Sequence, residues 1–103
     1  MTRRKGARIT FEEVEPDRGR RRWSARFGGR DLIDVSREPQ KTVANSTPKA
    51  EIEQGAPNVF TLWVQGGHSS GRRYSEHYTL GDAQERAKLW ARRRFRIAPE
   101  VAP

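Results

Sequence analysis

The spacing of apolar residues changes at Thr79, and this change constrains the fold more than any other feature of the sequence. Before Thr79, apolar and polar residues alternate over short segments, which is typical of β-strands. After it, apolar residues recur at every third or fourth position, which predicts an α-helix with one apolar face. This face carries Ala83, Ala87, Trp90, Ala91 and Phe95, with Leu80 at its start. Thr79 is suited to cap the helix, and Asp82 suits its positive end.

The alternating segments are predicted to form strands. They are 8–14, 20–27, 30–36, 58–65 and 72–78. Turn residues at 16–19 join the first two, and Gly28-Gly29 suits a two-residue hairpin turn that would bring 30–36 back beside 20–27. Residues 37–57 contain three prolines and few large apolar residues, so we expect a long flexible loop there, with room for one helical turn at Lys49–Gln54.

A chain of 103 residues has room for a single domain, and its apolar third supports only a thin core of two layers. We therefore predict an α+β fold for 1–103, in which an antiparallel sheet of about four to five strands packs on one C-terminal helix. A basic N-terminal arm (1–7) and a tail (97–103) would flank it. No apolar run reaches the length of about 18 residues that a membrane span needs, so no membrane partner is expected.

Basic residues give the chain a net charge of +8. Residues 1–37 contain eleven Lys/Arg against six Asp/Glu, and 72–103 contain eight against four, so the excess lies on the two flanking segments. Such a field attracts polyanions such as DNA and RNA. Arginine, which makes up most of the excess, also suits phosphate forks, although codon bias in a GC-rich genome produces the same composition.

Cysteine is absent, which removes disulfides and thiolate chemistry and fits a reducing compartment, so a cytoplasmic or nucleoid-associated location is expected. The two histidines, His68 and His77, have no further ligands at a fixed spacing, so neither a metal nor a cofactor is expected. No catalytic motif is present, so we expect a binding protein and not an enzyme. A small ribonuclease that uses His77 as acid or base is an alternative, although the neighbouring Glu76 would point to the opposite strand face.

Alternation divides the predicted sheet into two faces. The side chains expected to pack against the helix are Trp23, Ala25, Phe27, Phe60, Leu62, Val64, Tyr74 and Tyr78. The opposite face would present Arg22, Ser24, Arg26, Thr61, Trp63, Gln65, Arg73, Ser75 and His77. This array contains cations, neutral hydrogen-bonding groups and one tryptophan, and no acid. Such groups hold phosphates, read base edges and stack on unpaired bases, whereas a Trp63 buried under 37–57 or in a dimer contact would argue against this role.

The run from Phe60-Thr-Leu-Trp-Val through Arg73-Tyr74 to Tyr78-Thr79-Leu-Gly-Asp-Ala83 and Trp90 resembles two groups of DNA-binding domains. These are the plant ethylene-response type and the arm-binding domain of phage-type integrases. The resemblance covers residues 58–96, and it implies a three-stranded sheet, backed by one helix, that enters the DNA major groove through arginines and tryptophans. This chain differs by two extra strands, the 37–57 insertion and the lack of a closely spaced strand before Phe60. The C-terminal half is also similar to the end of a double-stranded-RNA-binding domain.

We therefore expect a nucleic-acid-binding domain, with DNA favoured over RNA, that uses the exposed sheet face. Phosphate contacts are also expected from the basic helix end (Arg92, Arg93 and Arg96) and from the arm (Arg3, Arg4 and Lys5). The alternative is a small adaptor or inhibitor with an acidic protein partner, in which the same arginines and aromatic residues act as interface anchors. The sequence leaves the oligomeric state open.

Overall fold

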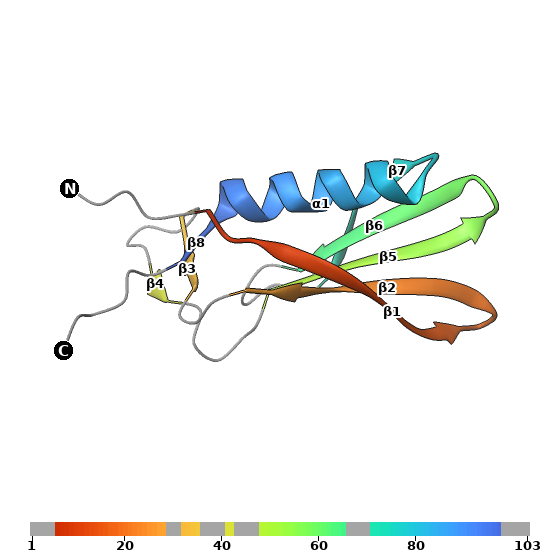
Figure 1. The fold of residues 1–103 in the computed structure, drawn as a ribbon, viewed down its shortest axis with the longest axis horizontal. Coiled ribbons are helices and arrows are strands. Elements are labelled where there is room, and N and C mark those ends of the chain that lie inside the picture. Colours follow the sequence, from red (N-terminus) through yellow and green to blue (C-terminus); the bar gives the residue numbers. More distant parts are fainter. Residues whose placement is uncertain (1–5, 29–31, 36–40, 43–47, 66–70, 98–103) are drawn as a thin grey trace.

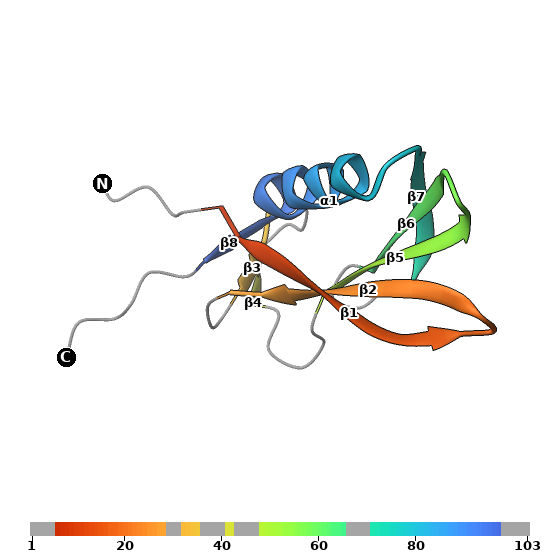
Figure 2. The same ribbon diagram turned by 45° about the vertical axis from the view of Figure 1, so that its right-hand side comes forward.

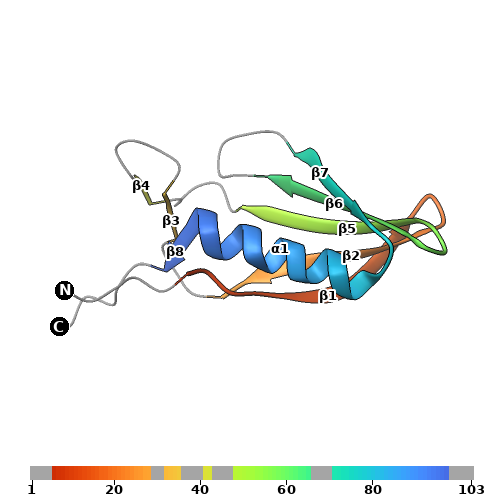
Figure 3. The same cartoon turned by 90° about the horizontal axis from the view of Figure 1, so that it is seen from above.

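The computed structural model describes residues 6–28, 32–35, 41–42, 48–65 and 71–97. Five strands form one antiparallel sheet in the order β1-β2-β5-β6-β7. Their bounds are β1 Ile9–Asp17, β2 Arg20–Phe27, β5 Lys49–Ala56, β6 Val59–Gln65 and β7 Arg72–His77. One helix, α1 (Leu80–Arg94), lies along one face of this sheet (Figures 1 and 3). The predicted α+β fold, with an antiparallel sheet packed on a C-terminal helix, is confirmed.

A second, smaller sheet lies at the C-terminal end of α1, in the order β4-β3-β8 (Figure 1). Its strands are β3 Leu32–Asp34, β4 Lys41–Thr42 and β8 Phe95–Ile97. The start of the chain joins this end of the molecule, because the Ala7 amide donates to the Phe95 carbonyl at 3.0 Å and Gly6 bridges to Arg96. The helix end, β8 and the beginning of β1 are therefore held together.

The core lies between α1 and the five-stranded sheet, which are seen from a second side in Figure 2. Ala83, Ala87 and Ala91 are fully buried on the helix, and their small side chains allow close approach to the sheet. Ile52 and Leu62 are fully buried beneath them. No helix in the part of the chain that the structure describes is long and apolar enough to cross a membrane.

Local signals in the sequence placed several elements correctly. The turn at 16–19 joins β1 to β2, with Arg18 and Gly19 in the left-handed region at φ of 53° and 77°. At the start of α1, Thr79 is the N-cap, and its Oγ1 accepts a hydrogen bond from the Asp82 amide at 3.1 Å. The predicted strands at 58–65 and 72–78 correspond to β6 and β7.

The sequence prediction was wrong about the middle of the sheet. Residues 49–56 were expected to lie in a flexible loop, with a helical turn at Lys49–Gln54, but they form β5, which pairs with both β2 and β6. The Gly28-Gly29 hairpin was also wrong, because β5 occupies the edge of β2 and β3 pairs with β8 instead. β5 was not predicted as a strand because its buried positions are Ala50 and Ile52, and only Ile52 is large and apolar.

Two tyrosines expected in the core lie at the surface. Tyr78 is 81% exposed and Tyr74 is 37% exposed. Tyr74 sits where the pairing of β6 with β7 shifts by one residue, since Leu62 lies opposite Ser75 while Trp63 lies opposite Arg73. Tyr74 is thus the extra residue of a β-bulge, and a bulge reverses the alternation of every residue beyond it.

Candidate nucleic-acid interface

The sheet face that α1 does not cover, here called the open sheet face, follows from the strand register, since directly paired residues point to the same side. Its members are Thr10, Glu12, Val14, Arg22, Ser24, Arg26, Lys49, Glu51, Glu53, Thr61, Trp63, Gln65, Arg73 and Glu76. Trp63 is 41% exposed there. The predicted site residues of β2 and of β6, which include Trp63, therefore lie on one face together with Arg73 of β7.

Two of the predicted site residues lie elsewhere. Ser75 and His77 pair with the buried residues Leu62 and Phe60, which places them on the helix side of the sheet. The bulge at Tyr74 is the reason, because it turns Glu76 and not its neighbours toward the open sheet face. Ser75 Oγ and His77 Nε2 form a hydrogen bond of 2.7 Å. Within the described residues, no group of three or more His, Cys, Asp or Glu side chains could hold a metal ion.

The expectation that the open sheet face contains no acid was also wrong. Each predicted arginine on it has a glutamate partner. The ion pairs are Arg22–Glu51 at 3.9 Å, Arg26–Glu12 at 3.4 Å and Arg73–Glu76 at 2.6 Å, with Arg20–Glu53 at 2.8 Å at the hairpin end. Two of these glutamates come from β5, a segment that was predicted to be a loop. Four arginines face four glutamates and Lys49 adds one cation without an ion pair, so this surface has only a small excess of positive charge to attract a polyanion.

A fifth pair, Arg21 with Glu13, lies on the other side of the β1–β2 hairpin. Arg21 Nε and Nη2 donate to the two carboxylate oxygens of Glu13 at 3.0 and 2.7 Å, and the guanidinium also lies 5.0 Å from the Trp23 ring centroid. The two hydrogen bonds from Arg21 hold the pKa of the Glu13 carboxyl below its ordinary value. The same pair raises the pKa of Arg21.

The Arg21→Gln variant is expected to raise the pKa of Glu13 toward its ordinary value, as measured by NMR titration of the side-chain carboxyl carbons. Because the folded-state pKa lies below the unfolded one, the pair stabilises the fold above the unfolded pKa, and this contribution is lost as the pH falls through the folded pKa. Arg26→Gln, which removes an arginine from the same strand, should leave the pKa of Glu13 where it is. An unchanged pKa in Arg21→Gln would contradict the assignment of Arg21 as the cause.

Several cations of the described residues have no carboxylate partner, among them Lys49 on the open sheet face and three arginines near the C-terminal end of α1. Arg92 and Arg93 project from the last turns of α1, and Arg8 lies at the start of β1, all three exposed. Within the described part of the chain, none of the three has an ion pair. We call these three residues the basic rim. The sequence predicted Arg92 and Arg93 as phosphate contacts but missed Arg8, because the pairing of Ala7 with Phe95 that brings β1 to the helix end is not visible in local patterns.

The third cation predicted at this end, Arg96, is turned back on the chain. Its guanidinium is only half-exposed and donates to the backbone carbonyls of Arg92 and Phe95. These bonds leave it less free than the basic rim to contact a phosphate. Arg86, farther up the helix, lies with its guanidinium 5.6 Å from the Tyr74 ring centroid. Arg3, Arg4 and Lys5 lie outside the described residues.

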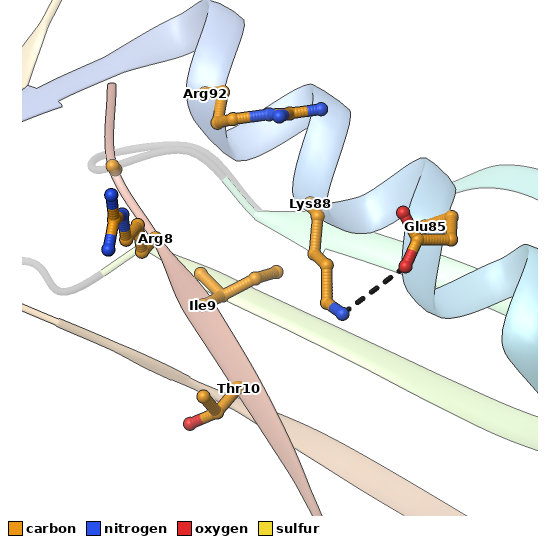
Figure 4. Close-up of a pocket in the computed structure, with 7 residues that line it drawn as sticks. Arg8, Ile9, Thr10, Glu85, Lys88 and Arg92 are labelled. Atoms are coloured by element: carbon orange, nitrogen blue, oxygen red, sulfur yellow. Dashed lines mark hydrogen bonds and ion pairs between the residues drawn. The ribbon is translucent and has the colours of Figure 1, made fainter. Parts of the chain in front are cut away.

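Two of the hollows that the described residues form lie beside these surfaces. The larger, of about 340 Å³, lies between α1 and β1, and we call it the α1–β1 groove (Figure 4). Its lining residues are Ala7, Arg8, Ile9, Thr10, Glu85, Lys88 and Arg92. A smaller hollow of about 190 Å³ adjoins Trp63 on the open sheet face, with Lys49, Glu51 and Gln65 around it. Arg8 and Arg92 of the basic rim therefore border the larger hollow, and the exposed tryptophan borders the smaller one.

Comparisons with known proteins identify no family and no relative of this chain. No protein-family model matches the chain, and neither the curated proteins nor the solved structures contain a match.

Proposed function

We propose that this domain binds nucleic acid, DNA in preference to RNA, through the basic rim. The observation that carries the proposal is the distribution of ion pairs. The arginines of the open sheet face are paired with glutamates, whereas Arg8, Arg92 and Arg93 have no carboxylate partner among the described residues. An unpaired guanidinium meets a phosphate without first losing an existing ion pair, and its fork geometry suits phosphate oxygens.

The proposed phosphate contacts do not lie on the open sheet face, the surface that the sequence favoured. A phosphate that approaches the open sheet face meets Glu12, Glu51, Glu53 and Glu76 beside the arginines, and these carboxylates repel it. The strand order β5-β6-β7 followed by α1 is the arrangement that the resemblance to ethylene-response-type and integrase arm-binding domains implies. This arrangement supports a nucleic-acid role. The glutamates of the open sheet face, however, favour a docking mode other than the entry of the sheet into the major groove that those families use.

The proposal is tested by measuring the affinity of the full chain for duplex DNA at several salt concentrations. We expect log K to fall linearly with log salt, with a slope of about −0.9 for each phosphate contacted. Single-stranded DNA and RNA of the same length, measured in parallel, rank the three polymers. Binding that is absent at low salt, or that does not change with salt, would rule out this function.

The open sheet face favours a second candidate function, protein binding. An exposed tryptophan surrounded by ion-paired arginines resembles the centre of protein interfaces, where Trp, Tyr and Arg are enriched. Because the charges on this face are balanced, the partner would not need to be acidic, in contrast to the adaptor hypothesis drawn from net charge. Competition separates the two functions, since an excess of duplex DNA would not displace a protein bound at Trp63.

A further inference from the structure

The two edges of the five-stranded sheet differ in what they offer to a further strand. β1 forms one edge, and it carries Pro16 and four acidic side chains, which are features that keep other strands from pairing with an edge. β7 forms the other edge, on the far side of the sheet (Figure 3). It contains no proline, and among the described residues only β6 pairs with it. The outer backbone groups of β7 therefore form a template with which another strand can pair.

The bulge at Tyr74 gives β7 an order of faces that is the same from both ends. Arg73 and Glu76 lie on the open sheet face, where they form an ion pair of 2.6 Å and their side chains are 55% and 52% exposed. Three of the other residues pair with buried residues of β6, and the Tyr74 ring lies near the Arg86 guanidinium of α1. The residues on the helix side are therefore Arg72, Tyr74, Ser75 and His77. From either end the order is helix side, open face, two residues on the helix side, open face, helix side.

This order of faces limits how two copies of β7 can pair. Antiparallel neighbours in one sheet place each residue opposite a residue that points to the same side. The register that pairs the whole strand has its two-fold axis between Tyr74 and Ser75, and the order of faces satisfies the condition there. This register places Arg73 opposite Glu76 of the partner subunit. Shorter registers that match the faces place Arg73 opposite Arg73, or Glu76 opposite Glu76. A strand without the bulge would mismatch its faces about the same axis.

We propose that two copies of this chain form a dimer through their β7 edges, with Arg73 of each subunit opposite Glu76 of the other. Such a contact is isologous, as a two-fold axis requires, and it joins the two five-stranded sheets into one. Opposite charges on directly paired strand residues stabilise the pairing and like charges destabilise it, so the charges favour the full register over the shorter ones. A single short strand from each subunit makes a small interface, and we therefore expect a weak, reversible dimer. The dimer does not depend on the proposed nucleic-acid binding.

Sedimentation equilibrium of the full chain, without nucleic acid and over a range of protein concentrations, measures the association. The weight-average mass is expected to rise with concentration from the 11.9 kDa of the monomer toward twice that value. A chain that stays monomeric at every concentration would overturn the proposal and leave the edge to a strand of another protein. Growth beyond a dimer would also overturn it, since an isologous contact closes after two copies.

Charge-reversal variants test the register. Arg73→Glu and Glu76→Arg each place like charges opposite one another at both contacts, so each is expected to weaken the dimer about tenfold. Arg26→Glu is the matched control, because it reverses an arginine of the open sheet face that is also paired with a glutamate but lies on β2. Its lower net charge reduces the general repulsion between copies, so it should dimerise at least as tightly as the wild type. Equal weakening by Arg26→Glu and Arg73→Glu would overturn the assignment of the edge.

A mixture of the two β7 variants gives the sharpest measurement. In a heterodimer of Arg73→Glu with Glu76→Arg, opposite charges meet again at both contacts, so its affinity is expected to return to that of the wild-type dimer. The chain that carries both substitutions should regain its homodimer for the same reason. Circular dichroism checks that each variant is folded, which we expect because the Arg73–Glu76 pair is exposed and contributes little to stability. Failure of both the mixture and the double variant to associate would overturn the proposal.

Discussion

The Phe95→Ala variant is expected to lose about 3–5 kcal/mol of unfolding free energy. Phe95 is fully buried, and its ring makes edge-to-face contacts with Trp90 at 5.4 Å and Phe27 at 6.0 Å between centroids. It is also the residue at which α1 ends and β8 begins, and its carbonyl accepts the hydrogen bond from Ala7. A domain of this size has a total stability of about 5–15 kcal/mol, so this single loss removes a large part of it.

Urea denaturation followed by circular dichroism measures this effect. Phe11→Ala is the matched control, since it is the same substitution at a ring that is only partly buried at the edge of the core. The control should lose clearly less stability than Phe95→Ala. If the two losses are equal, the junction between the helix and the small sheet is not the centre of the core that the ring contacts indicate.

The second large effect is expected from the basic rim. Replacing Arg8, Arg92 and Arg93 together with glutamine should reduce the magnitude of the salt slope for duplex DNA by about 2.7, if each contacts one phosphate. Relative to equal binding at 1 M salt, this difference in slope makes the affinity of the triple variant at 0.1 M salt about 500-fold weaker than that of the wild type. Glutamine keeps a long side chain and is tolerated in helices about as well as arginine, so the fold is expected to persist.

The control for the basic rim is a second triple variant, Arg22→Gln, Arg26→Gln and Arg73→Gln, on the open sheet face. It removes the same three charges, so any effect of net charge alone is equal in the two proteins. Because these arginines are already paired with glutamates, we expect its salt slope to stay close to that of the wild type. If the magnitude of the salt slope falls in this variant and stays at the wild-type value in the basic-rim variant, the DNA lies on the open sheet face.

Periodicity in the sequence was sufficient to predict the elements whose signals are local. The β1–β2 hairpin follows from its turn residues, and α1 follows from the alanines on one face and from the Thr79 cap. Alternation also placed Leu62 and Val64 in the core and left Trp63 exposed. These features depend on residues within a few positions of one another, so the chain encodes them without reference to distant partners.

The tertiary structure alone decided the centre of the sheet and the balance of charge on its open face. β5 is a strand because β2 and β6 pair with it on both sides, and the bulge at Tyr74 exists only in the pairing of β6 with β7. Arg20 and Glu53, which form an ion pair, lie 33 residues apart in the sequence. Strand pairing and ion pairing join residues that are distant along the chain, so a cation seen in the sequence becomes free or neutralised only when the fold brings its neighbours to it.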